Sequence, residues 1–139
     1  LHLVLLYPAD PALAIRAGQA YGWLDEARAG GAVPPLPRRA TRFRPTQVGN
    51  DLEAPCMARH PALGGLRGLL VGAGATAALM SGSGPTVFGL FAGRAEARRA
   101  ARAVQAAVEG RDVRILVART VQRPPRVETW RSPRSASSR

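Results

Sequence analysis

The stretch LMSGSGPTVFGLF, residues 79–91, decides the fold class that this sequence predicts. Two glycines and two serines alternate in it, a proline follows, and a run of strand-forming apolar residues then begins. The preceding residues 75–80, ATAALM, also predict a strand, so a short glycine loop joins two neighbouring strands. Strands joined by so tight a loop are antiparallel.

The segment upstream predicts a strand and then helices. Residues 1–8, LHLVLLYP, form a short apolar run closed by proline, which is typical of a strand. A helix is expected after it, with Asp10 as the N-cap, Pro11 as the first helical residue and the glycine pair at 30–31 as the stop.

The sequence GNDLE, residues 49–53, predicts the start of a short helix. Asn50 or Asp51 can cap that helix, and Glu53 is spaced to reach back to the cap as in a capping box. Pro61 opens a second helix, which ends at the glycines of residues 72–74.

The segment downstream predicts one more helix and one more strand, at residues 92–110 and 112–120. The order is therefore strand, helix, two short helices, strand, strand, helix, strand. An antiparallel sheet with helices on one face is an α+β sandwich of ferredoxin-like character. We expect this domain to occupy residues 1–119.

Two glycine loops are candidates for binding phosphate. GAGATA, residues 72–77, matches a dinucleotide fingerprint nominally, but a strand and not a helix is expected after it, so we interpret it as a helix end. In SGSG, residues 81–84, the backbone N–H groups and two hydroxyls can converge on an anion. On these grounds alone, a phosphate cradle and a simple hairpin turn both remain open.

The charge is strongly positive and unevenly distributed. The formal net charge is +11, and all 20 basic residues are arginines, because the chain has no lysine. Residues 120–139 carry five arginines and one glutamate among prolines and serines, a composition that predicts a disordered tail. The Pro- and Arg-rich segment 32–49 predicts a solvated loop. This charge favours one alternative function, a free-standing arginine-rich module that binds nucleic acid.

Cys56 is the only cysteine, and its neighbourhood argues for a small buried side chain and not for a reactive thiol or a metal ligand. No apolar run reaches the ~18 residues of a membrane span, and we expect a cytoplasmic protein. Because Leu1 begins directly in a strand pattern, we also expect that material upstream is missing.

Residues 80–91, MSGSGPTVFGLF, resemble the third conserved motif of the GHMP small-molecule kinases. With GNDLE upstream, the chain is most similar to the branch of that family whose acceptor is a cytidine-diphosphate-linked methylerythritol. The resemblance runs from about residue 4 to residue 117. It implies a phosphotransferase that uses ATP and Mg²⁺ to phosphorylate the 2-hydroxyl of that substrate in non-mevalonate isoprenoid biosynthesis.

The resemblance covers only the C-terminal domain of such a kinase. The family's ATP phosphate loop, its lysine and its catalytic aspartate belong to an N-terminal domain, so the resemblance implies that domain as a partner and no catalytic or metal-binding residue here. The chain alone is therefore expected to be inactive; a nonfunctional remnant of a split gene is a further alternative. The residues expected to support the ATP phosphate loop are Ser81, Gly82, Ser83 and Gly84. A structural cap or substrate-side motif is expected at Asn50, Asp51 and Glu53.

Overall fold

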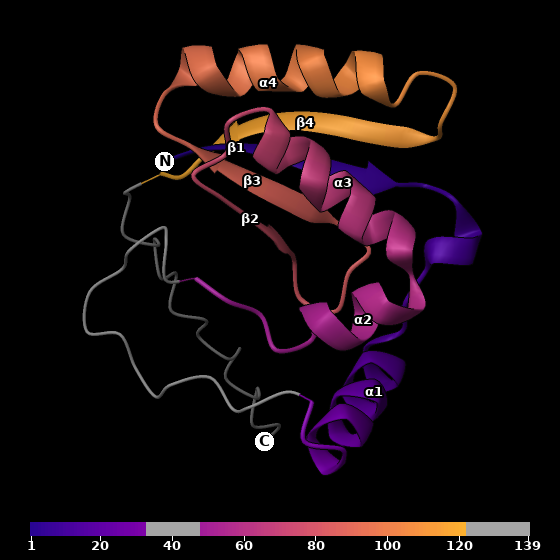
Figure 1. Cartoon of the computed structure of the whole chain (residues 1–139). Coiled ribbons are helices and arrows are strands. Elements are labelled where there is room, and N and C mark those ends of the chain that lie inside the picture. Colours follow the sequence, from indigo (N-terminus) through magenta and orange to yellow (C-terminus); the bar gives the residue numbers. More distant parts are fainter. Residues whose placement is uncertain (33–47, 122–139) are drawn as a thin grey trace, which may run out of the picture.

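Four strands form one antiparallel sheet in the computed structural model, in the order β2-β3-β1-β4 (Figure 1). The structure describes residues 1–32 and 48–121, and the statements below concern those ranges. The strands are β1 (His2–Pro8), β2 (Ala77–Met80), β3 (Val87–Phe91) and β4 (Val113–Arg119).

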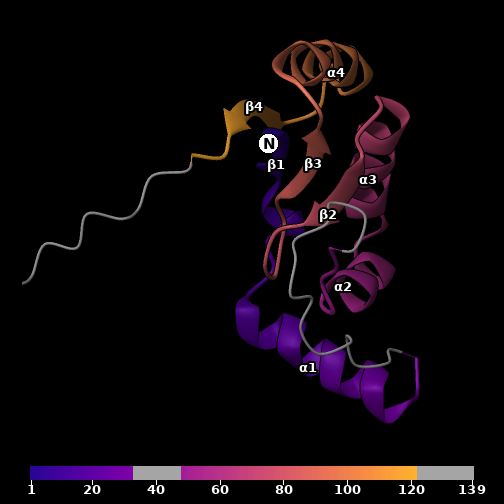
Figure 2. The ribbon, with the colours of Figure 1, turned by 90° about the vertical axis from the view of Figure 1, so that its left-hand side faces the viewer.

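The helices are placed asymmetrically around this sheet. In Figure 2 the helices α3 and α4 cover one face, while α1 and α2 lie beyond one end of the strands. The expected α+β sandwich with helices on one face is confirmed, and the elements follow in the predicted order. The helices are α1 (Ala17–Ala29), α2 (Glu53–Arg59), α3 (Pro61–Gly72) and α4 (Arg94–Ala107), with a 3₁₀ turn, η1, at Pro11–Leu13.

The core lies between the sheet and the two covering helices. Residues paired across antiparallel strands point to the same face, so each row of partners is buried or exposed together. One row consists of residues that face the helices: Met80, Val87, Leu6 and Ile115. α3 contributes Leu63, Leu66 and Leu70, and α4 contributes Ala97, Ala100 and Val104.

Gly89 in β3 allows α3 to approach the sheet closely. A Cβ atom at this position would lie 3.1 Å from the Cβ of Ala75 and 3.3 Å from the Cβ of Leu70. Those distances are shorter than ordinary contacts, so a larger residue would push the helix away. The glycine in VFGLF is therefore explained by packing.

The opposite face of the sheet is apolar as well. The row next to the buried one contains Leu79, Phe88, Leu5 and Leu116. Leu116 is 56% exposed and Tyr7 is 40% exposed. In the described ranges no helix covers this face (Figure 2).

The helix expected from Pro11 begins later than predicted. Asp10 does cap Pro11, since its Oδ1 accepts from the N–H of Ala12 at 2.9 Å, but the turn stops after three residues. The backbone is extended at Ala14, and Ile15 is 9% exposed in the core. We attribute the break to this burial, which requires the chain to leave the helical path before α1 starts.

Two predictions about α3 are confirmed. α3 begins at Pro61, and its end is followed by Gly74 with φ +89°, after which comes a strand and not the helix of a dinucleotide site. Among the described residues, no helix is long and apolar enough to cross a membrane. The predicted loop and the predicted tail fall mostly on residues 33–47 and 122–139, outside the described ranges, and they stay predictions.

Candidate functional site

The SGSG loop joins β2 to β3 as a tight turn, in which Ser81 and Gly82 are exposed and Ser83 and Gly84 are partly buried. The N–H of Ser81 donates to the carbonyl of Thr86 at 2.8 Å, and the N–H of Gly84 donates to the carbonyl of Ser81 at 2.9 Å. Gly82 and Gly84 both have positive φ, of 56° and 88°. Side chains disfavour such angles, so the glycines set the shape of this loop.

Two backbone donors and two hydroxyls of this loop are available to a ligand. Within the described ranges, the N–H groups of Gly82 and Ser83 have no hydrogen-bond partner. The same holds for the hydroxyls of Ser81 and Ser83. Successive N–H groups in a turn of this kind form a concavity suited to an anion.

Asn50 connects the GNDLE segment to this loop. Its Nδ2 donates to the carbonyl of Met80 at 2.9 Å and to the carbonyl of Gly82 at 2.8 Å. Its Oδ1 accepts from the N–H of Leu52 at 3.0 Å, next to the start of α2. One side chain therefore forms the turn before the helix and also holds two carbonyls of the loop.

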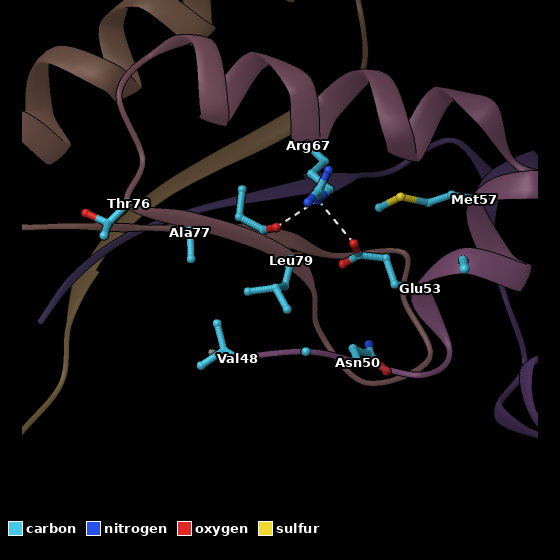
Figure 3. Close-up of a pocket in the computed structure, with 11 residues that line it drawn as sticks. Val48, Asn50, Glu53, Met57, Arg67, Thr76, Ala77 and Leu79 are labelled. Carbon is cyan, nitrogen blue, oxygen red and sulfur yellow. Dashed lines mark hydrogen bonds and ion pairs between the residues drawn. The ribbon is translucent and has the colours of Figure 1, made fainter. Parts of the chain in front are cut away.

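Glu53 does not reach back as in the predicted capping box. Its Oε2 accepts from the N–H of Met80 at 2.7 Å, and its Oε1 lies 3.1 Å from Nε of Arg67. The same Nε donates to the carbonyl of Ala78 at 2.8 Å. Figure 3 shows Arg67 projecting from α3 toward both partners. The edge of β2 and a cationic side chain thus attract the carboxylate away from its own helix start.

These side chains line a groove of about 530 Å³ along the outer edge of β2. Figure 3 shows the groove between β2, α3 and the segment that leads to α2. Its remaining lining is mostly apolar and includes Val48, Met57 and Leu79.

Asp51 has a different partner from its neighbours in the motif. Its carboxylate pairs with Arg28 of α1 at 2.5 Å, and among the described residues no hydrogen bond or ion pair joins it to the SGSG loop. The structure therefore brings Asn50 and Glu53 to the SGSG loop and directs Asp51 elsewhere. The sequence analysis missed Arg67, although it is the one charged residue in the otherwise apolar helix PALGGLRGLLVG.

Cys56 lies in the core and is fully buried. Burial raises the pKa of its thiol, and the charge of the nearby Arg59 lowers it to a smaller extent. Its expected role as a small buried residue agrees with this environment.

The arginines of α4 form an exposed face. Arg94, Arg98, Arg99 and Arg102 are all exposed, and Arg99 pairs with Glu96 at 3.5 Å. An exposed pair of this kind contributes little to stability.

Comparison with known proteins matches the family described as GHMP kinases C terminal to residues 36–110. A 4-diphosphocytidyl-2-C-methyl-D-erythritol kinase of Anaeromyxobacter sp. (strain K) is 67% identical over 142 residues, covering 100% of this chain. Another, from Anaeromyxobacter sp. (strain Fw109-5), is 61% identical over 137 residues, covering 99% of this chain.

A solved structure of a 4-(cytidine 5'-diphospho)-2C-methyl-D-erythritol kinase has a TM-score of 0.55 and 27% identity. The match covers 84% of this chain and 42% of that one. The chain likewise spans 45% of the length of the two Anaeromyxobacter relatives. These matches are kinases, and they give no support to the nucleic-acid-binding alternative.

Proposed function

Because the chain belongs to the GHMP kinase family and supplies its C-terminal domain, we propose that it is part of a kinase for 4-diphosphocytidyl-2-C-methyl-D-erythritol. The reaction transfers the γ-phosphate of ATP to the 2-hydroxyl of this substrate, a step of non-mevalonate isoprenoid biosynthesis. A cytoplasmic location stays a prediction.

One observation carries this proposal: a relative named for that activity is 67% identical along 100% of this chain. The aligned region covers the whole chain, so it contains the positions of the SGSG loop and of GNDLE. The relative is more than twice as long as the matched part, so the proposed enzyme also needs an N-terminal domain.

The SGSG loop contributes positioning and charge stabilisation in this proposal. Phosphoryl transfer depends mainly on donors that hold the phosphates in line and neutralise their charge. The N–H groups of Gly82 and Ser83 and the hydroxyl of Ser83 donate to phosphate oxygens, directly or through the phosphate loop of the N-terminal domain. Gly84 shapes the turn, and Ser81 closes it through its hydrogen bond to Thr86.

Mg²⁺ is not assigned to residues of this chain. In the described ranges there is no group of three histidine, cysteine, aspartate or glutamate side chains that could hold a metal ion.

The proposal is tested by completing the enzyme. The N-terminal part of the Anaeromyxobacter sp. (strain K) relative is joined ahead of Leu1, and phosphorylation of the cytidine substrate by ATP is measured. We expect turnover by the joined protein and none by the 139-residue chain or by the N-terminal part alone.

The natural relative, purified in the same way, is the positive control. A joined protein that folds but does not phosphorylate the substrate, while the natural relative does, contradicts the proposal. Turnover by the 139-residue chain alone contradicts the assignment of the catalytic groups to the other domain.

A further inference from the structure

Side chains form hydrogen bonds with the backbone along the outer edge of β2, where a neighbouring strand would otherwise pair. β2 is the first strand in the sheet order, and an edge strand presents unpaired backbone groups. Here the carbonyl of Ala78 accepts from Arg67, the N–H of Met80 donates to Glu53, and the carbonyl of Met80 accepts from Asn50. The last of these contacts continues past the strand into the SGSG loop.

The amide of Asn50 spans the residue at which the loop begins. Its Nδ2 has two hydrogens, and the two acceptors are the carbonyls on either side of Ser81, those of Met80 and Gly82. Both acceptors are carbonyls and the partner of Oδ1 is an N–H, so the orientation of the amide is determined by its partners. The two carbonyls belong to the peptide groups that carry the N–H groups of Ser81 and Ser83, so Asn50 directly sets the direction of the Ser83 donor. The N–H of Gly82 belongs to the peptide group between them, whose carbonyl, that of Ser81, accepts from Gly84.

Helix capping does not account for these contacts. The N-cap of α2 is Leu52, which has no side-chain cap hydrogen bond, so the expected cap at Asn50 or Asp51 is not formed. The oxygen of Asn50 accepts from Leu52 in the turn that precedes the helix. The two bonds from Nδ2 reach residues 30 and 32 positions away and add nothing to the helix. Asn50 and Glu53 together form a clamp on the backbone at Met80 and Gly82. The carboxylate of Glu53 is held in turn by Arg67.

We infer that Asn50 is a positioning residue for phosphoryl transfer, which sets the geometry of the SGSG loop, and that Glu53 supports it. This inference rests on the proposed function. Asn50 acts through the backbone of the loop and touches no reacting atom. Displacement of a positioning group by about 1 Å can lower a rate by about 100-fold, so a loop held by one amide is a sensitive point.

Asn50→Asp is the sharpest test in the joined two-domain kinase. It keeps the shape of the side chain and the acceptor for Leu52, but it loses both donors and places a carboxylate oxygen against two carbonyls. We expect kcat to fall by about 10- to 100-fold, while KM for the cytidine substrate changes by less than about threefold. Gln105→Glu, the same chemical change at an exposed position of α4, is the control and should leave kcat unchanged.

Glu53 provides a second pair of variants. Glu53→Gln keeps an oxygen that can accept from Met80, whereas Glu53→Ala removes it. We expect the glutamine variant to retain most of kcat and the alanine variant to lose about tenfold or more.

Amide hydrogen exchange supplies a readout that does not require turnover. The protected amides of Met80, Ser81 and Gly84 should exchange about 10-fold faster in Asn50→Asp, and those of α4 should not change. Wild-type kcat in Asn50→Asp overturns the inference. If the unsubstituted joined protein is inactive, the proposed function fails, and unchanged exchange at these three amides then overturns the clamp as well.

Discussion

Asn50 and Gly82 are 32 residues apart in the sequence, and Nδ2 of Asn50 donates to the carbonyl of Gly82 at 2.8 Å. This bond joins the two motifs that carry the family resemblance. GNDLE and SGSG therefore form one structural unit, in which the first segment holds the second. A substitution in either segment should therefore alter the structure of the other.

The hydrogen bond from Met80 to Glu53 should contribute far more to the free energy of unfolding than an exposed ion pair does. We expect Glu53→Ala to lower the free energy of unfolding by about 1–3 kcal/mol, because the N–H of the buried Met80 loses its acceptor. Glu26→Ala breaks an exposed ion pair with Arg59, and it should change the free energy of unfolding by less than about 0.5 kcal/mol. Urea unfolding of the two variants compares them; equal losses would contradict the role given to Glu53.

The thiol of Cys56 should be protected in the folded chain. Because the side chain is fully buried, a thiol reagent has to wait for an opening of the structure. We expect labelling to be at least about 100-fold slower than in urea, which corresponds to an opening free energy of about 2.8 kcal/mol. Labelling at the rate of a free thiol would contradict the burial.

The same thiol makes stability depend on alkaline pH. Burial raises the pKa of Cys56 above its ordinary value of 9.0, so the unfolded chain loses this proton first as the pH rises. The contribution is fully present below pH 9.0 and is lost as the pH rises through the higher value in the folded chain. The difference in unfolding free energy between the wild type and Cys56→Ala should therefore shrink above pH 9.0; a constant difference would contradict this prediction.

Local signals in the sequence predicted most of the fold. Pro61 at a helix start, glycines at helix ends and a glycine loop between apolar runs each act over a few residues. Such signals gave the order of the elements, which the structure confirms. The predicted start of α1 was wrong, because the sequence does not show that Ile15 is buried in the core.

The candidate site could be predicted only in part. Asn50 and Glu53 were singled out, but as a helix cap or a substrate-side motif, since capping is a local pattern. Their contacts with Met80 and Gly82 depend on how α2 and α3 pack beside β2, which no spacing encodes. Arg67 carried one usable signal, a lone charge in an apolar helix, and such a residue needs a partner.

Core and open-face leucines should differ sharply in their contribution to stability. Leu70 is fully buried beneath β3, whereas Leu116 is 56% exposed on the uncovered face of the sheet. We expect Leu70→Ala to lower the free energy of unfolding by about 2–5 kcal/mol, and Leu116→Ala by less than about 1 kcal/mol. Thermal or urea unfolding measures both, and a larger loss at Leu116 would be inconsistent with helices on one face only.

The turn at Gly84 should tolerate no side chain. Its φ is +88°, and a Cβ would lie 2.9 Å from Sδ of Met80 and 3.4 Å from Cδ1 of Ile15. A left-handed residue costs about 1–2 kcal/mol and overpacking about 1–3 kcal/mol more, so Gly84→Ala should lower the free energy of unfolding by about 2–5 kcal/mol. Gly31→Ala is the matched control, because Gly31 has φ +72° and its Cβ would have no neighbour within 4 Å. The control should lose only the backbone part, about 1–2 kcal/mol. Equal losses in the two variants would show that packing against Met80 and Ile15 does not constrain this turn.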